Sequence, residues 1–210
     1  MRRIEELFRR YPVLEECRRD IESAEEELNT CFEHGGKLLI CGNGGSAADA
    51  VHIAGELLKG FLKKRPLPEE KKEAMRRAAP EIPEEMFGKL QEGLPVIPLV
   101  EESALLSAFS NDVDPVLAYA QEVIALGRKG DLLLAISTSG NAKNCIAAVL
   151  TAKGLGIRTL ALTGRGGGRL AGHADLSICV PENETFKVQE LHLPVYHALC
   201  AAVEEHFFSD

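Results

Sequence analysis

A glycine-rich turn lies between a short apolar run and a helical stretch early in the chain. Residues 38–47 are Leu-Leu-Ile-Cys-Gly-Asn-Gly-Gly-Ser-Ala, and the helix that Ser46 opens carries His52 and Glu56. Glycine lets the backbone approach an anion closely. The first N–H groups of a helix add donors and a partial positive charge. Because a carboxylate follows on the same helix, the pattern indicates an enzyme that acts on a phosphorylated small molecule.

A second polar turn, Ser137-Thr138-Ser139-Gly140-Asn141, also follows an apolar run and precedes a helical stretch. Its three neighbouring hydroxyl groups can donate to phosphate oxygens. Ligands of open parallel sheets bind outside the carboxyl ends of the strands. Ser and Thr at such a position can also simply cap the next helix, but three hydroxyls exceed what one cap needs. We therefore expect the two turns to converge on one phosphate group.

Residues 42–47 also match the dinucleotide pattern GxGxxA. That match is weak alone, because the acidic residue expected about 20 positions later would fall near the basic Lys63–Arg65. The Walker pattern is absent, since no Gly-Lys-Ser/Thr follows the turn. The residues favour a sugar phosphate over NAD or ATP, and we expect no nucleotide cofactor.

His52 and Glu56 are four residues apart and therefore share one helix face. They could be a solvated carboxylate beside a half-buried ring, a pair of metal ligands, or a base with its neighbour. Gln189 and His197 place polar groups in an otherwise apolar C-terminal stretch, about 12 Å apart along an ideal helix. They reach one metal ion only if the helix starts or bends between them, for instance at Pro194, or if the ligands come from different subunits.

The composition limits the classes of protein to which this chain can belong. The chain has 210 residues, 45% hydrophobic and 27% charged, with a net charge of −8, which is ordinary for one globular domain. The negative charge argues against nucleic-acid or anionic-membrane binding. The six cysteines form no CxxC pair, and there is no apolar signal region or membrane-length run. We expect a cytoplasmic protein.

Short apolar runs alternate with helical stretches along the chain. The predicted strands are residues 37–41, 96–100, 131–136, 158–162 and 176–180. The predicted helices between and after them are residues 46–62, 115–127, 142–154 and 187–207. Continuous apolar runs suit strands that are buried on both faces, and the alternation predicts an α/β fold with a parallel sheet between helices.

Two further segments lie outside this alternation. Residues 1–33 form a predicted N-terminal helical segment, broken by Pro12 and stopped by Gly35-Gly36. Residues 62–95 carry charge clusters and five prolines. We interpret this segment as a solvated surface insertion with a helix over 69–78. The alternative is a lid or interface element, because the segment leaves the end of the helix that bears Glu56.

Taken together, the motifs resemble the SIS (sugar isomerase) domain and, within it, the phosphoheptose isomerases. The likeness covers residues 30–67 and 95–207, with Gly-Asn-Gly-Gly-Ser, Ile-Ser-Thr-Ser-Gly-Asn, Leu-Thr-Gly and Gln-Glu-x-His in family order. It implies a three-layer αβα sandwich with a five-stranded, flavodoxin-like parallel sheet. The single domain would span residues 1–210, with an insertion at 68–94. It also implies conversion of sedoheptulose 7-phosphate to D-glycero-D-manno-heptose 7-phosphate by a homotetramer with shared active sites.

The resemblance also assigns roles to residues. Glu56 would be the base that forms an enediol, and His197 its acid/base partner. In some family members zinc is bound, and the matching positions here are His52, Glu56, Gln189 and His197. The residues matched to substrate contacts are Asn43, Gly44, Gly45, Ser46, Asn111, Asp112, Ser137, Thr138, Ser139 and Gln189, with Asn111 and Asp112 in a loop.

The chain departs from the family pattern at several positions. Ala142 replaces a frequent Ser, Lys59-Gly60 replaces a Gly-Arg, Phe186 replaces an Asp, and residues 69–94 have no usual counterpart. The alternative function is a non-catalytic SIS protein that senses a sugar phosphate or acts as a scaffold, such as one that binds a replication initiator. A relative of that kind lacks the helix Glu and has Asn at the position of His197, so the presence of both residues favours an enzyme. A nicotinamide-dependent dehydrogenase is disfavoured by the missing acidic residue.

Overall fold

Within the described residues, 2–208, five parallel strands form one sheet in the order β2-β1-β3-β4-β5. They are β1 (Leu38–Gly42), β2 (Val96–Pro98), β3 (Leu132–Ser137), β4 (Arg158–Thr163) and β5 (Leu176–Cys179). All five were predicted, with ends that differ by one or two residues. The order is that of flavodoxin-like doubly wound sheets. The structure is a computed structural model, and residues 1 and 209–210 of the predicted 1–210 domain lie outside the part it describes.

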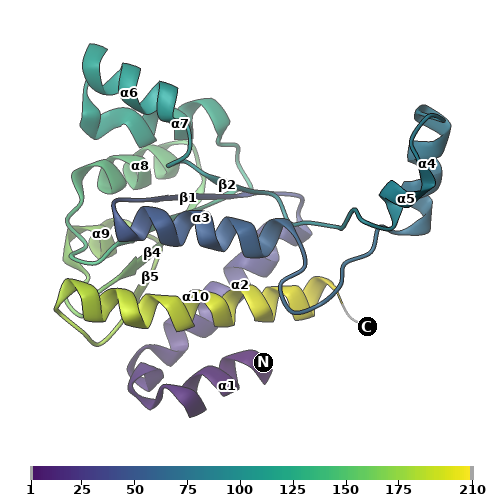
Figure 1. Cartoon of the computed structure of the whole chain (residues 1–210). Coiled ribbons are helices and arrows are strands. Elements are labelled where there is room, and N and C mark those ends of the chain that lie inside the picture. The colour runs from purple at the N-terminus through teal and green to yellow at the C-terminus, as the bar shows by residue number, and fades with distance from the viewer. Residues whose placement is uncertain (1, 209–210) are drawn as a thin grey trace.

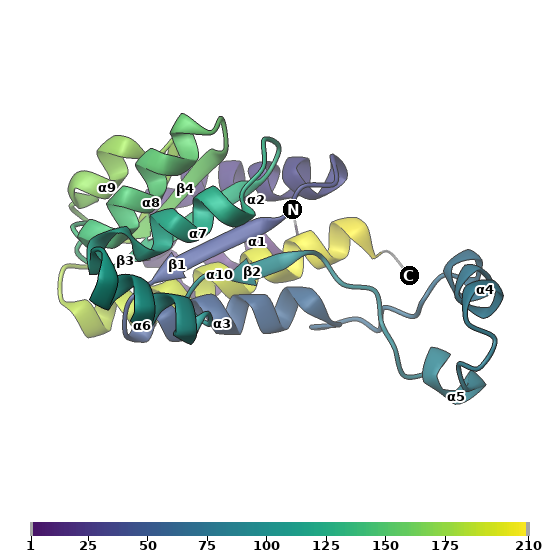
Figure 2. The same ribbon diagram turned by 90° about the horizontal axis from the view of Figure 1, so that it is seen from above.

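The sheet is buried on both faces because alternate side chains enter two different apolar clusters. Leu38 and Ile40 of β1 pack into one cluster, and Leu39 and Cys41 pack into the other. Helices cover both faces (Figures 1 and 2). On the first side lie α2 (Arg18–Glu33), α3 (Gly45–Leu58) and α10 (Thr185–Phe207); on the second lie α7 (Ala118–Leu126), α8 (Lys143–Gly154) and α9 (Gly168–His173). This arrangement confirms the three-layer αβα sandwich.

The N-terminal segment is helical, as predicted, but it consists of three pieces. They are α1 (Arg2–Arg10), the 3-10 helix η1 (Pro12–Cys17) and α2. Pro12 stands at the first position of η1, where its missing N–H costs nothing. Ile4, Leu7 and Phe8 of α1 are buried against the cluster that contains α10.

The segment between β1 and β3 holds elements that the sequence predicted only in part. Helix α4 (Glu69–Ala78) has the predicted bounds, whereas α5 (Glu84–Phe87), α6 (Ser103–Asp112) and the 3-10 helix η2 (Pro115–Leu117) were not predicted as such. Residues 66–91, here called the arm, carry α4 and α5 and stand away from the body of the molecule (Figures 1 and 2). No helix among residues 2–208 is long and apolar enough to cross a membrane.

Candidate active site

The two polar turns line one cavity of about 360 Å³ at the carboxyl edge of the sheet. Gly44 has a φ of +56°, and a Cβ on Gly45 would lie 2.2 Å from the side-chain nitrogen of Gln189. The positive φ of Gly44 favours glycine in the turn, and the absence of a side chain on Gly45 leaves room for the end of the Gln189 side chain. Helix α3 begins at Gly45, one residue earlier than predicted. The lining residues are Asn43, Gly44, Gly45, Ser46, Ile136, Ser137, Thr138, Ser139, Ala142, Thr185 and Gln189.

Two contacts hold the glycine-rich turn in place. The side-chain amides of Asn43 and Asn144 donate to each other's oxygens, both at 2.9 Å. The Tyr119 hydroxyl donates to the carbonyl of Gly42 at 2.6 Å. Asn43 was matched to a substrate contact, and here its amide ties the first turn to α8. Asn144 was missed, although an Asn in the first turn of the helix after Ser137–Asn141 was a signal that could have pointed to it.

The three hydroxyl groups of the second turn differ in what they contact. Ser139 accepts a hydrogen bond from the backbone N–H of Asn141 at 3.2 Å, a contact within the turn; the N-cap of α8 is Ala142, and no side chain caps that helix. Ser137 and Thr138 show no side-chain hydrogen bond to any residue that the structure describes, and both line the cavity. Their hydroxyls are the ones available to a phosphate group.

A polar cluster lies further along α3, where α10 packs beside it. His52 Nε2 is 3.2 Å from Glu56 Oε1 and 3.4 Å from His197 Nε2. On its other side, His52 Nδ1 is 3.0 Å from the Tyr196 hydroxyl, which lies 3.3 Å from Asp49 Oδ1. A carboxylate and two imidazoles in contact can pass protons between carbon and oxygen atoms of a ligand.

The electrostatic environment favours a neutral His197. Burial, followed by the neighbouring His52, lowers the pKa of the His197 imidazole below its usual value of 6.5. Burial raises the pKa of the Asp49 carboxyl, although its contacts with Tyr196 and His52 oppose this. Burial also raises the pKa of the Tyr196 phenol. A neutral imidazole at neutral pH can accept a proton, as an acid/base partner must.

A buried ion pair fixes the end of α3 that carries Glu56. Arg65 and Glu204 have side chains 0% and 1% exposed and are joined at 2.9 Å. The Arg65 guanidinium donates to the carbonyls of Leu57 at 2.7 Å and Glu56 at 3.2 Å, so it satisfies helix-end groups that would otherwise lack partners. Glu204 also accepts from the backbone N–H of Phe61 at 2.8 Å. Sequence reasoning missed this pair, because no local pattern marks a contact between residues so far apart in sequence.

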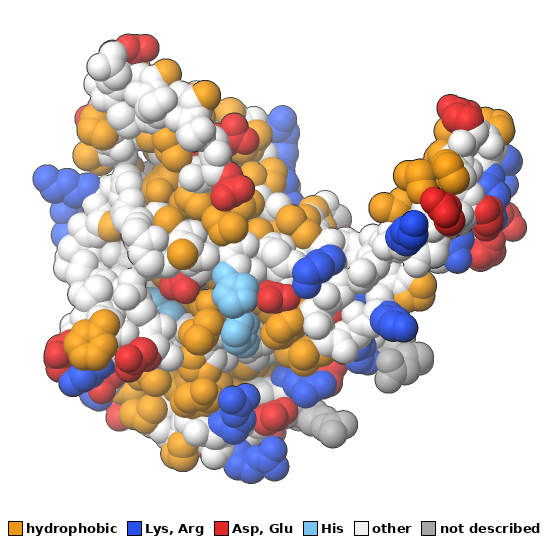
Figure 3. Space-filling model, viewed as in Figure 1, with side chains coloured by type: hydrophobic (Ala, Val, Ile, Leu, Met, Phe, Trp, Pro, Cys, Tyr) orange, Lys and Arg blue, Asp and Glu red, His pale blue; other side chains and the backbone are white. Residues whose placement is uncertain are grey.

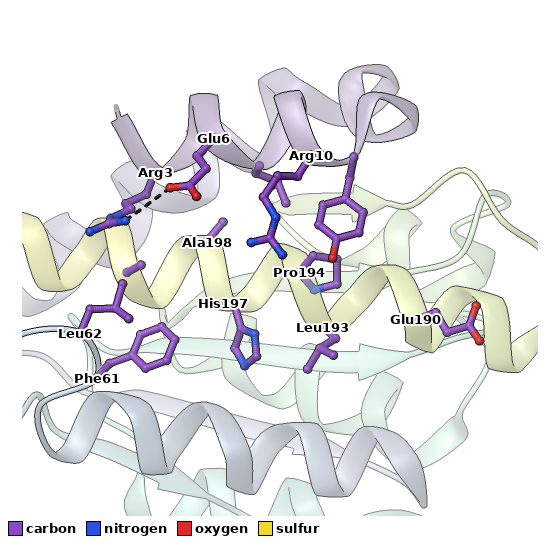
Figure 4. Close-up of a pocket in the computed structure, with 13 residues that line it drawn as sticks. Arg3, Glu6, Arg10, Phe61, Leu62, Glu190, Leu193, Pro194, His197 and Ala198 are labelled. Carbon is purple, nitrogen blue, oxygen red and sulfur yellow. Dashed lines mark hydrogen bonds and ion pairs between the residues drawn. The ribbon is translucent and has the colours of Figure 1, made fainter.

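His197 also lines a second cavity, of about 420 Å³, between α1, α10 and the chain that follows α3. Figure 4 shows the His197 ring pointing from α10 toward α3, with Phe61 on one side and Leu193 on the other. Arg10 of α1 lines the same cavity. The polar cluster is thus open to solvent on the face where α3 and α10 lie side by side.

The cavity and the polar cluster are separate places in one chain. From Gly45 to Glu56, α3 advances 11 residues, about 16 Å at a rise of 1.5 Å. Helix α10 continues through Pro194, which leaves Gln189 at the cavity and His197 at the cluster, about 12 Å apart along the axis. One chain therefore does not place Glu56 near the two turns, nor Gln189 near the other three predicted zinc ligands. Among residues 2–208, no group of three or more His, Cys, Asp or Glu is arranged to hold a metal ion.

Asn111 and Asp112 do not lie in the loop that the resemblance implied, whereas their contact with substrate stays a prediction. They form the end of helix α6 and not a loop, and the Asn111 amide donates to the Asp112 carboxylate at 2.8 Å. Both are exposed, and neither lines the cavity of the two turns. The run Ser103–Asp112 contains no Gly or Pro that would interrupt a helix.

Comparisons with known proteins agree with this geometry. Two family models, both described as SIS domain, match residues 4–87 and 104–202. The fold and the match together make this a SIS-domain protein. A phosphoheptose isomerase from Roseiflexus sp. is 40% identical over 185 residues, which cover 88% of this chain and 81% of that protein. One from Helicobacter pylori strain P12 is 36% identical over 92% of this chain and 91% of that protein.

A solved structure agrees as well. The phosphoheptose isomerase from Neisseria gonorrhoeae superposes with a TM-score of 0.75 and 32% sequence identity, covering 96% of this chain and 94% of that chain. The chain belongs to the phosphoheptose isomerase family.

Proposed function

We propose that this protein is a cytoplasmic aldose–ketose isomerase that converts sedoheptulose 7-phosphate to D-glycero-D-manno-heptose 7-phosphate. The observation that carries the proposal is the pairing of a cavity suited to phosphate with a carboxylate–imidazole cluster, in a chain 40% identical to a phosphoheptose isomerase. The free hydroxyls of Ser137 and Thr138 and the start of α3 would bind the phosphate.

We further propose that each active site is shared between two copies of the chain. A substrate bound by its phosphate in the cavity would meet Glu56 only across a distance of about 16 Å along α3. A second copy seated on the open face of α3 and α10 would bring its own Glu56 and His197 to that substrate. Such an arrangement agrees with the homotetramer that the family resemblance implies.

The chemistry follows from the side chains of the cluster. Glu56 would remove the proton from the carbon beside the carbonyl group, and the electron pair of that C–H bond would form the enediol. Glu56 would then return the proton to the neighbouring carbon, while neutral His197 would move protons between the two oxygens. Each acid/base contribution of this kind is worth about 10²–10⁴-fold in rate.

Zinc remains a proposal for the assembled protein. His52 Nε2 lies 3.2 Å from Glu56 Oε1 and 3.4 Å from His197 Nε2, but within the described residues of one chain these three are not arranged as a metal-binding group. Gln189 would complete the set only from a second copy, since in its own chain it lies at the cavity. A zinc ion bound there would polarise the substrate carbonyl. Metal analysis of the purified protein and of His52→Ala tests this: equal zinc content in both would contradict the ligand set.

An activity assay tests the proposed function. Sedoheptulose 7-phosphate is incubated with the wild type, with Glu56→Gln, and with Glu26→Gln, an exposed position on α2. We expect turnover with the wild type and Glu26→Gln. Glu56→Gln should bind the sugar phosphate without converting it. Full turnover by Glu56→Gln would remove Glu56 as the base, and no turnover of this substrate by the wild type would refute the proposal.

A further inference from the structure

The arm is attached to the body only through its root. Pro66 and Gln91 form an antiparallel bridge, and the Glu92 N–H donates to the Arg65 carbonyl at 2.7 Å. The Gln91 side chain also accepts from the Gly60 N–H at 2.9 Å. Because Arg65 is the residue that closes the end of α3, the arm leaves the body next to Glu56. In Figure 3 open space separates its two helices from the rest of the molecule.

The arm buries little of its own surface. Helix α4 has ten residues and none of them is buried, although helices this short are marginal in water without packing. Within the arm, the Arg76 guanidinium lies over the Phe87 ring, 5.0 Å from its centre. Exposed ion pairs such as Arg76–Glu84 add further contacts. Exposed ion pairs contribute little stability, and the buried hydrophobic side chains of the arm are Leu67 and Phe87, so little apolar burial holds the arm in this position.

Exposed apolar side chains lie on the arm and continue onto the body. Met86 and Leu90 of the arm are 42% and 41% exposed. At the root, Leu58 and Leu62 are 51% and 53% exposed, and Leu193 of α10 is 41% exposed. Figure 3 shows hydrophobic side chains around the histidines and on the side of the arm that faces the body. The apolar surface lies on both sides of the gap between the arm and the body, and an exposed apolar surface of this kind marks an interaction site.

We infer that the arm packs against a second copy of this chain, seated in the notch between the arm and the α3–α10 face. This inference rests on the proposed function, because the shared site already requires a second copy on that face. The arm begins where that copy would sit, and Leu62 and Leu193 line the same hollow as His197. A contact through Met86 and Leu90 would extend the interface and stabilise the arm.

Paired substitutions test the inference by sedimentation equilibrium. The double variant Met86→Ser/Leu90→Ser removes the exposed apolar side chains of the arm. The matched control, Glu85→Ser/Lys89→Ser, removes an exposed ion pair from the same segment without changing the net charge. We expect the first to raise the dissociation constant of the assembly by about tenfold or more, and the control to leave it unchanged. Deletion of residues 67–90, whose flanking residues Pro66 and Gln91 are paired, should weaken the assembly at least as much.

The possible results separate this inference from the proposed function. Assembly as tight as that of the wild type, in both the double variant and the deletion, would overturn the inference. A wild-type chain that stays monomeric at every concentration would also overturn it. Arm-dependent assembly of a wild type that converts no sugar phosphate would support the inference while refuting the proposed function.

Discussion

The two ends of the paired helices α3 and α10 carry different chemistry. At their N-terminal ends, backbone and hydroxyl groups surround a cavity, where Gly45 and Gln189 are in close approach. Further along, side chains form a carboxylate–imidazole cluster around His52. The first end suits binding of an anion and the second suits proton transfer. The ends are about 16 Å apart along α3, and this separation is the reason for our proposal that complete sites form between copies.

The largest effect is expected at the cluster. His197→Asn should lower kcat by about 10²–10⁴-fold with little change in KM, because it removes proton transfer and leaves the phosphate cavity intact. His206→Asn, on the same helix and paired with Glu33 at 2.6 Å, is the matched control and should keep full activity. Steady-state kinetics of both variants measures this. A change confined to KM in His197→Asn would place His197 in binding instead.

The buried carboxyl of Glu122 on α7 should make the stability of the protein depend on pH. The Glu122 carboxyl is 1% exposed and has no hydrogen-bond partner among the described residues. Burial raises its pKa from 4.5 to about 7. As pH rises from 4.5 through 7, the unfolded chain releases this proton first, so the free energy of unfolding falls, by about 3 kcal/mol in total.

Glu122→Gln should therefore unfold at a higher temperature than the wild type at pH 8, and at a similar one at pH 4.5. Thermal unfolding at both pH values measures the difference. His192, whose pKa burial lowers to about 4, destabilises both proteins alike as pH falls below 6.5, so the comparison is made at each pH separately. An equal Tm at pH 8 would contradict a raised pKa of Glu122 in the folded protein.

Substitutions in the second turn should separate phosphate binding from the internal contact that Ser139 makes within the turn. Thr138→Val removes a hydroxyl that is free to contact phosphate and should raise KM by about tenfold, with kcat little changed, because a hydrogen bond to a charged group is worth about 1.5–3 kcal/mol. Ser139→Ala removes a hydroxyl that already accepts from Asn141 and should affect KM less. Kinetics on the two variants tests the order. A larger KM effect in Ser139→Ala would reverse the assignment.

The smallest expected effect is in the pH profile of turnover. Because burial lowers the pKa of His197 below 6.5, the imidazole stays neutral to lower pH than an exposed histidine does. The acid limb of the kcat profile, where His197 gains a proton, should therefore lie below pH 6.5. Titration of the His197 ring signals by NMR provides the direct check, and a midpoint above 6.5 would contradict the assignment.

Much of the fold could be predicted from local patterns. Runs such as Leu132–Ile136 are apolar at every position, which indicates a strand buried on both faces, and the polar turns after them mark the carboxyl edge. That the turns after β1 and β3 share a cavity follows from these strands being neighbours. Helix α4 was predicted with its observed bounds, because Pro68 precedes it and charged helix formers fill it.

The rest depends on contacts that no local pattern encodes. The Arg65–Glu204 pair and the Asn43–Asn144 pair join distant segments. The position of the arm follows from the bridge between Pro66 and Gln91. The distance between the cavity and Glu56 depends on where α3 begins and on how α10 packs beside it. Sequence reasoning named the residues of both ends, but it could not show that one chain keeps them apart.

Mixing a variant that lacks the base with a variant that binds phosphate weakly, assayed at a substrate concentration well below the raised KM, tests the shared site most directly. One variant carries Glu56→Gln with intact turns, and the other carries Ser137→Ala and Thr138→Val with an intact Glu56. Unfolded together and refolded as hybrids, they should regain turnover of sedoheptulose 7-phosphate, because some sites then combine an intact turn from one copy with an intact Glu56 from another. A refolded mixture no more active than its two components refolded separately would contradict the account.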